Sequence, residues 1–116
     1  MAIPSGSGTE VLKRAYLDNA STTEQSIFDG VANHIYTIIS IVILERNNAS
    51  GNTFDLAVDY NASGNSQKIL LAQSMSAQQT FVFNDKIVLT GTDKLRFDCS
   101  AGNFDVWCSY IDQDWT

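Results

Sequence analysis

The pentapeptide Asn-Ala-Ser-Gly-Asn occurs twice, at residues 48–52 and 61–65, with one short alternating segment between the copies. A related tetrapeptide, Ser-Ala-Gly-Asn, occupies residues 100–103. Glycine adopts positive φ angles without steric cost, and Asn and Ser side chains hydrogen-bond to the nearby backbone, so such clusters mark tight turns. The sequence therefore predicts short strands that are joined by polar turns.

Residues 34–45 form the most apolar segment, and most residues between Ile35 and Leu44 are β-branched. Branching at Cβ favours the extended backbone over the helix. Both alternating faces of this segment are apolar, whereas an antiparallel strand usually keeps one face in water. We therefore expect the core to cover one face, and a terminal arm or another subunit to cover the other.

Further strands are predicted where apolar and polar residues alternate, or where turn residues bound a short apolar run. With segment 34–45 they give seven to nine strands and almost no helical periodicity. This pattern predicts an all-β fold, either an antiparallel β-sandwich or a jelly-roll-like barrel. The further segments are 9–16 (where a short helix is the alternative), 24–28, 53–60, 66–72, 80–83 and 86–90 (paired as a hairpin), 94–99 and 103–111.

The length of 116 residues suits one domain. Residues 1–8 contain the only proline and two glycines, so we expect them to form a flexible N-terminal arm. Residues 9–116 are expected to form a single β-sandwich domain. Within it, alternation predicts that Asp55 and Asp59 point away from Phe54, Leu56 and Val58.

Cys99 and Cys108 flank the turn at residues 100–103. In a hairpin built around this turn, Cys99 would face Phe104 and Cys108 would face Leu95. The two sulfurs would then lie about 13 Å apart, at about 3.3 Å per residue. This exceeds the Cα separation of about 7 Å that a disulfide tolerates. We therefore expect both cysteines to be reduced and buried in the core.

The same hairpin register places Arg96 across from Trp107, as a cation–π pair, and Asp98 across from Asp105, as a like-charge pair. Adjacent carboxylates are ligands that Ca²⁺ accepts, but no further oxygen-rich ligand set accompanies this pair. Neutralisation by Lys94, by Arg96 or by a neighbouring subunit is therefore the preferred interpretation. Binding of an ion is the alternative.

The sequence contains no catalytic or cofactor motif. His34 is the only histidine, and without a neighbouring nucleophile we expect it to pack at a strand end. Two cysteines and one distant histidine do not match a zinc pattern, and no phosphate-binding loop is present. Asp112 and Asp114 lack the supporting motif of a glycosidase acid pair, and we expect them to face solvent. We predict no enzyme activity, no metal and no cofactor.

Composition bears on partners and location. Seven Lys and Arg against thirteen Asp and Glu give a formal net charge of −6, which disfavours nucleic acid and anionic membranes. The apolar run in 34–45 is about half of the roughly 20 residues that a membrane-spanning helix needs. Residues 1–8 lack the basic and apolar parts of a secretory signal, so we expect synthesis in the cytoplasm.

The sequence combines three features. They are residues 1–12, the turns rich in Asn, Ser and Gly, and residues 106–115, Val-Trp-Cys-Ser-Tyr-Ile-Asp-Gln-Asp-Trp. In these features the chain resembles the small all-β virion proteins of tailed bacteriophages, most of all capsid decoration (cement) proteins. The resemblance implies a β-sandwich that forms a homo-oligomer, often a trimer, on the outer surface of the head. There it would bind the major capsid protein or another virion protein.

Trp115 lies near the end of the chain. An exposed tryptophan is costly in water unless it packs on another surface, so we expect Trp115 at an interface. Other assignments are a tail, collar or head–tail connecting component, or a carbohydrate-binding β-sandwich in which Trp107, Tyr110 or Trp115 stacks on a sugar. The expected interface residues are Ile3, Pro4, Ile39, Ile41, Trp107, Tyr110 and Trp115.

Overall fold

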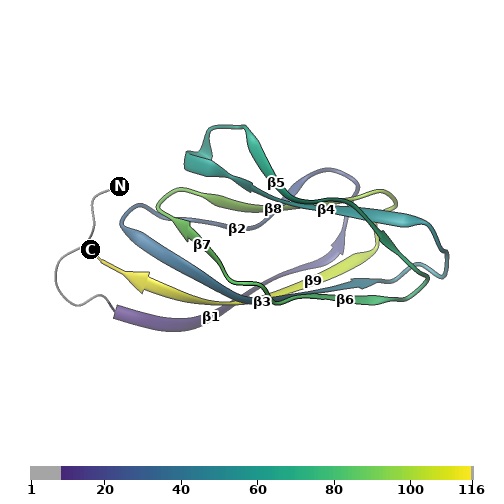
Figure 1. The fold of residues 1–116 in the computed structure, drawn as a ribbon, viewed down its shortest axis with the longest axis horizontal. Helices are drawn as coiled ribbons and strands as arrows, with labels where there is room; N and C mark the ends of the chain where they lie inside the picture. The colour runs from purple at the N-terminus through teal and green to yellow at the C-terminus, as the bar shows by residue number, and fades with distance from the viewer. Residues whose placement is uncertain (1–8, 116) are drawn as a thin grey trace.

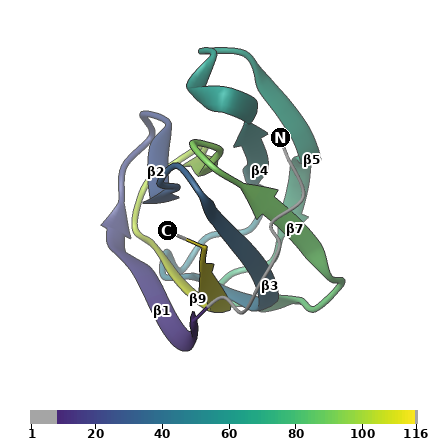
Figure 2. The same ribbon diagram turned by 90° about the vertical axis from the view of Figure 1, so that its left-hand side faces the viewer.

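The computed structural model describes residues 9–115 and shows two antiparallel sheets that face each other (Figures 1 and 2). Sheet A has the order β1-β9-β3-β6, with β7 also paired to β3, and sheet B has the order β2-β8-β4-β5. The prediction of an all-β fold is confirmed, and the architecture is the sandwich. The elements are β1 (Thr9–Ala20), β2 (Gln25–Asp29), β3 (His34–Glu45), β4 (Asn52–Asp59), the 3₁₀ helix η1 (Tyr60–Ala62), β5 (Ser66–Met75), β6 (Thr80–Phe83), β7 (Ile87–Thr90), β8 (Lys94–Cys99) and β9 (Phe104–Asp114).

β3 is the inner strand to which most of sheet A is attached. It pairs with β9 on one side and with β6 and β7 on the other. A bulge between Ile38 and Ser40 shifts the register with β9, so that Ile38 is buried before it and Ile41 and Ile43 after it. The two faces that simple alternation predicts therefore exchange sides at the bulge.

β6 and β7 do not form the predicted hairpin. β6 pairs with residues 41–44 of β3, and β7 pairs with residues 35–38 of the same strand, both in the antiparallel sense. Two segments that are antiparallel to one strand run in the same direction. They are therefore successive parts of one edge strand, and the polar residues 84–86 interrupt that strand instead of reversing it.

β8 and β9 do not form a hairpin either, because β8 belongs to sheet B and β9 to sheet A. The turn at residues 100–103 carries the chain from one sheet to the other. The predicted contacts of Arg96 with Trp107 and of Asp98 with Asp105 are therefore wrong.

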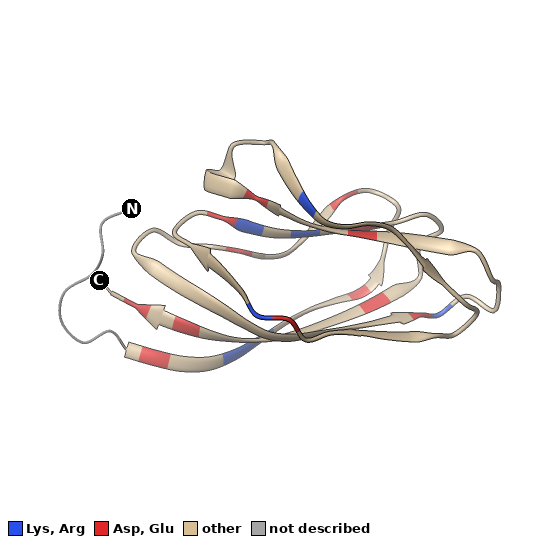
Figure 3. Cartoon of the chain, viewed as in Figure 1, with Lys and Arg blue, Asp and Glu red and all other residues tan. Residues whose placement is uncertain are grey.

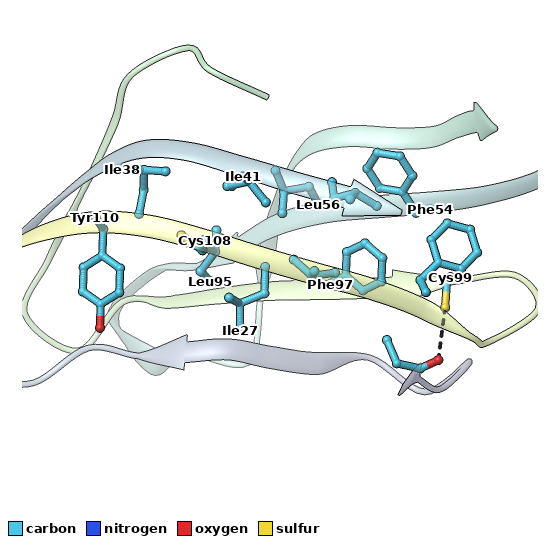
Figure 4. Close-up of a cluster of buried hydrophobic side chains, with 14 of the residues drawn as sticks. Ile27, Ile38, Ile41, Phe54, Leu56, Leu95, Phe97, Cys99, Cys108 and Tyr110 are labelled. Carbon is cyan, nitrogen blue, oxygen red and sulfur yellow. Dashed lines mark hydrogen bonds between the residues drawn. The ribbon is translucent and has the colours of Figure 1, made fainter. Parts of the chain in front are cut away.

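Aromatic and aliphatic side chains from both sheets interleave to form the core (Figure 4). Phe97 has ring-centroid distances of 5.7 Å to Phe54 and 6.0 Å to Phe104, so rings from the two sheets touch. Cys108 is fully buried, and the Cys99 thiol lies 3.2 Å from the carbonyl oxygen of Ser21. Both cysteines are free and buried, as predicted, although the register from which this was inferred is wrong.

The alternation of β4 holds at Phe54 and Leu56, which are buried. Asp59 departs from the expected exposure, because it is buried as well. Its Oδ1 accepts hydrogen bonds from the Gly64 N–H (2.9 Å) and the Ser63 hydroxyl (3.3 Å). The carboxylate therefore holds the second Asn-Ala-Ser-Gly-Asn turn, a role that strand alternation does not reveal.

Charged residues are spread over both sheets and their turns (Figure 3). The described part of the chain contains no helix with the length and apolar character that crossing a bilayer requires.

The burial of the cysteines leads to a test of the core. Burial raises the pKa of the Cys108 thiol to about 12, and only the thiolate reacts with alkylating agents. We expect iodoacetamide at neutral pH to modify Cys108 roughly a hundredfold more slowly, or slower still, in the native protein than in the unfolded chain. Mass spectrometry of the alkylated peptides measures the ratio. Equal rates in the two states would show that the core is open at β9.

Candidate interaction surface

The outer face of sheet A carries exposed apolar side chains in a transverse row. The cross-strand register places Tyr16 of β1 beside Trp107 of β9, Trp107 beside Val42 of β3, and Val42 beside Val82 of β6. Directly opposed residues share one face of a sheet. Tyr16, Trp107 and Val82 are exposed, and Val42 between them is half-buried.

A second apolar row crosses the same face. Leu12 lies beside Ile111, Ile111 beside Thr37, and Thr37 beside Val88 of β7. Leu12 has 72% of its surface exposed, and Val88 is exposed too. A polar row of Arg14, Ser109 and Ser40 lies between the two apolar rows. All three rows belong to one surface that extends from β1 across sheet A, and for its two apolar rows we call it the outer apolar face.

A shallow depression of about 290 Å³ adjoins the first row. Its lining includes the apolar side chains of Trp107, Val42 and Leu44 and two acidic residues, Asp18 and Asp105. A concave site with apolar walls and a few polar groups is the form in which proteins receive a ligand or a protruding side chain of a partner.

Trp107 is held in place at this surface. Its ring stacks on Tyr16, with centroids 5.7 Å apart and planes 17° apart. The guanidinium carbon of Arg14 lies 5.0 Å from the Trp107 centroid and 5.5 Å from the Tyr16 centroid. Arg14 thus takes the place that sequence reasoning gave to Arg96. Because the ring is already ordered, binding on it loses little conformational entropy.

The expected interface residues divide between the surface and the core. Trp107 is exposed, and Ile39 is half-buried at the bulge of β3. Ile41 and Tyr110 are core residues instead, and the Tyr110 ring stacks on Phe28 with centroids 4.5 Å apart. Ile41 is turned inward by the bulge, and Tyr110 faces inward by its parity on β9, so neither is available to a partner at the surface.

Three of the expected interface residues, Ile3, Pro4 and Trp115, lie near the ends of the chain, and the structure describes only Trp115. Trp115 is half-buried: its backbone N–H donates to the carbonyl of Asn33 (3.0 Å), while its indole Nε1 is buried and has no hydrogen-bond partner within residues 9–115. Ile3 and Pro4 lie outside the described residues. A role for these three residues at an interface stays a prediction.

An ionic network ties β1, β3 and β9 together near one end of the sandwich. Lys13 donates to Oδ2 of Asp112 (2.8 Å), and Nδ1 of His34 lies 2.7 Å from Oδ1 of the same carboxylate. Nε2 of His34 lies 3.5 Å from Asp114. His34 packs at a strand end as expected, but Asp112 is buried, contrary to the expected exposure to solvent.

The network sets the charge of Asp112. Burial alone raises the pKa of this carboxyl, but the hydrogen bonds from Lys13 and His34 outweigh it, so the pKa lies below its usual range. The pKa of Lys13 is raised in turn, first by its hydrogen bond to Asp112. Within residues 9–115, no group of three His, Cys, Asp or Glu side chains is placed to hold a metal ion.

A like-charge pair does occur, but on sheet B and with a different partner. Asp98 of β8 lies opposite Asp55 of β4. Burial and then the charge of Asp55 raise the pKa of Asp98. Burial also acts to raise the pKa of Asp55, but hydrogen bonds from the Ala72 N–H (2.7 Å) and from Lys68 (3.0 Å) hold it below the usual range. The neutralising cation is thus Lys68, and not Lys94 or Arg96.

Comparison with known proteins bears on the fold. No protein-family model matches the chain, and no curated protein matches its sequence. A chain of the infectious bursal disease virus Gx strain matches with a TM-score of 0.60 and 13% identity, over 94% of this chain and 33% of that chain. This chain therefore spans about a third of that viral chain.

Two further matches cover both chains almost fully. The capsid of Helicobacter pylori bacteriophage KHP30 gives a TM-score of 0.55 and 8% identity, over 98% of this chain and 92% of that chain. The Bacillus endospore appendages, which form disulfide-linked pili, give 0.52 and 14%, over 100% and 97%. At these identities the matches show a shared β fold.

The ionic network predicts how stability depends on pH. Because the folded pKa of Asp112 is depressed, its carboxylate stabilises the fold above the unfolded pKa of about 3.9, and this contribution is lost as the pH falls through the folded pKa. We expect Asp112→Asn to lower the free energy of unfolding by about 1.5–3 kcal/mol at neutral pH. Urea unfolding measures this difference.

The control for this experiment is Asp85→Asn, which changes an exposed carboxylate in the break between β6 and β7. We expect it to shift stability by less than about 0.5 kcal/mol. The deficit of the Asp112 variant should shrink as the pH falls and vanish at an acidic pH at which the wild-type carboxyl is also protonated. An unchanged deficit at that pH would mean that Asp112 stabilises the fold without its charge.

Proposed function

We propose that this protein is a non-enzymatic structural component of a phage particle, and specifically a decoration protein that stabilises the head shell. The observation that carries this proposal is the outer apolar face of sheet A. The likeness of the sandwich to chains of viral particles supports it at the level of the fold. A tail, collar or head–tail connecting position would use the same face in the same way.

The outer apolar face has the anatomy of a protein interface. Monomeric soluble proteins rarely leave large contiguous apolar patches in water, and tyrosine and tryptophan are enriched where partners bind. The stacked Tyr16 and Trp107 form an aromatic centre. Charged residues, among them Glu10, Asp18 and Asp105, lie around it as a polar rim. We infer that the face lies on the shell and that Trp107 is its main anchor.

The net charge of the chain indicates the kind of partner, and the number of copies on a shell determines how strongly they bind together. The partner is the major capsid protein or another virion protein, because a net charge of −6 disfavours nucleic acid and anionic membranes. The protein is made in the host cytoplasm and resides in the virion as a homo-oligomer. Many copies that each bind weakly hold a shell strongly, because one attached subunit raises the effective concentration of the next. A trimer is the state that the sequence resemblance implies.

A carbohydrate-binding function is the second candidate, and a specific observation favours it. The exposed stack of Tyr16 and Trp107 borders a depression that Asp18 and Asp105 also line. An aromatic face can pack on the apolar face of a sugar ring while carboxylates accept hydrogen bonds from its hydroxyls. Trp107 remains the platform residue in this reading, and Tyr110 does not, because it is in the core.

Trp107→Ala tests the shell-binding proposal. We expect it to weaken co-sedimentation with phage heads that lack the protein by roughly tenfold or more, because truncation of an anchor typically costs about 2 kcal/mol or more. Tyr60→Ala is the matched control, since Tyr60 in η1 is 45% exposed and Trp107 is 46% exposed. Equal binding of the wild type and the Trp107 variant would contradict the proposal. A glycan-array signal that Trp107→Ala abolishes would instead favour the carbohydrate-binding function.

A further inference from the structure

Among the described residues, three of the four sheet edges are irregular. β2 has a register shift between Ser26 and Phe28. β5 has two shifts in its pairing with β4, and Ala72 within it has a φ of 51°. The edge made of β6 and β7 is broken at residues 84–86. Bulges and breaks of this kind prevent a further strand from pairing along an edge.

The fourth edge, β1, is irregular only towards its end, where the register with β9 shifts between Leu17 and Ala20. From Thr9 to Leu17 it pairs with β9 without a register shift, and on its other side the described residues contain no paired strand. Most of its side chains are exposed. A regular edge presents a row of backbone N–H and C=O groups to which the strand of another chain can bond.

We propose that β1 pairs antiparallel with β1 of a second copy of this protein, about a two-fold axis at Leu12, so that the sheets A of the two copies become one continuous sheet. The proposal rests on the self-association in the proposed function, but a two-fold contact closes a pair of subunits in place of the trimer that the sequence resemblance implies. The contact does not require the shell, because the residues that form it all belong to β1.

Charge complementarity selects this register. When two identical antiparallel strands are related by a two-fold axis, one residue lies opposite its own copy and the other pairs follow by symmetry. With Leu12 at the axis, Glu10 lies opposite Arg14 of the second copy, and Arg14 lies opposite Glu10 of the second copy. Opposite charges in direct cross-strand pairs stabilise a sheet.

The side chains of this register are already placed on one face. Glu10, Leu12 and Arg14 lie opposite Gln113, Ile111 and Ser109 of β9, on the outer face of sheet A. Gln113 donates to Oε1 of Glu10 (2.8 Å), and the ring stack below Arg14 holds its guanidinium at the surface. Both charges therefore lie at the surface of this face, where their present contacts include residues of β9.

Neighbouring two-fold registers lack this match. An axis at Lys13 or Arg14 places that cation opposite its own copy, which costs stability. An axis at Tyr16 would pair Arg14 with Asp18 of the second copy, but the regular part of β1 ends at Leu17, and Asp18 already lies 3.6 Å from the guanidinium of Arg46. The axis at Leu12 keeps its opposed pairs, residues 9 to 15, inside the regular strand.

The proposed pairing also has a consequence for the outer apolar face. Leu12 begins the second apolar row, which continues through Ile111 and Thr37 to Val88. Contact between Leu12 and its copy joins the rows of two subunits into one apolar strip. A strip of double length would bind a shell with two subunits at once.

A charge swap tests the register. We expect sedimentation velocity over a concentration series to show wild-type mass rising from the 12.7 kDa of one chain towards that of two copies. Glu10→Arg and Arg14→Glu should each raise the dissociation constant by roughly tenfold or more, because each creates a like-charge pair. The double variant Glu10→Arg/Arg14→Glu should restore association, since it reverses both charges. No restoration, or a wild type that stays monomeric throughout, would overturn the proposal.

The apolar contact at the axis has a matched control on the other sheet. Leu12 and Leu71 are exposed to 72% and 69%, but Leu71 lies on the irregular edge strand β5. Leu12→Lys should abolish association, whereas Leu71→Lys should leave the dissociation constant unchanged. Circular dichroism verifies that both variants fold. Equal effects of the two substitutions would overturn the role of β1. Because this experiment contains no phage heads, its failure is distinct from a failure of shell binding.

Discussion

One strand that is apolar on both faces determines much of this structure. The inner side of β3 places Ile38, Ile41 and Ile43 in the core, and its outer side contributes Val42 and Leu44 to the surface. Burial of the inner side drives folding, because apolar surface removed from water contributes roughly 25 cal/mol per Å². The outer side stays apolar after the domain has folded. The same strand therefore stabilises the monomer and leaves a face suited to a partner.

The ordering of sheet A around β3 explains where that face is most accessible. β9 lies between β3 and β1, and it presents Trp107 and Ile111 outward while Val106 and Cys108 point into the core. The end of the same strand carries Asp112, which joins β1 and β3 through Lys13 and His34. The ionic network fixes the relative position of three strands, and so it also fixes the rows of side chains on the outer apolar face.

Local sequence signals predicted the strands but not their pairing. The bounds of β3 and β8 match the expected segments, since alternation and β-branching act within one strand. Both expected hairpins are wrong, because a turn shows only that the chain changes course. Gly102 and Asn103 adopt positive φ angles of 71° and 54°, yet they lead into the opposite sheet. Whether a turn closes a hairpin or joins two sheets depends on contacts with strands that are distant in sequence.

The composition of the outer apolar face also depends on strand pairing that local sequence does not predict. Trp107 was among the expected interface residues, but Tyr16, Val42 and Val82 become its neighbours only through pairing between distant strands. The bulge in β3 likewise turns Ile41 inward, and the local sequence around Ile41 does not predict this bulge. Lys13 and Asp112 are separated by 99 residues in the chain, so their ion pair could not be read from spacing.

The central claim is that the outer apolar face of sheet A is covered by another chain in the assembled particle. Cryo-electron microscopy of a phage particle that incorporates this protein tests it most directly. The account predicts density for the sandwich on the outside of the shell, with Trp107, Val42 and Val82 packed against a neighbouring chain. A map in which this face points into solvent, or in which the protein has no density at all, would contradict it.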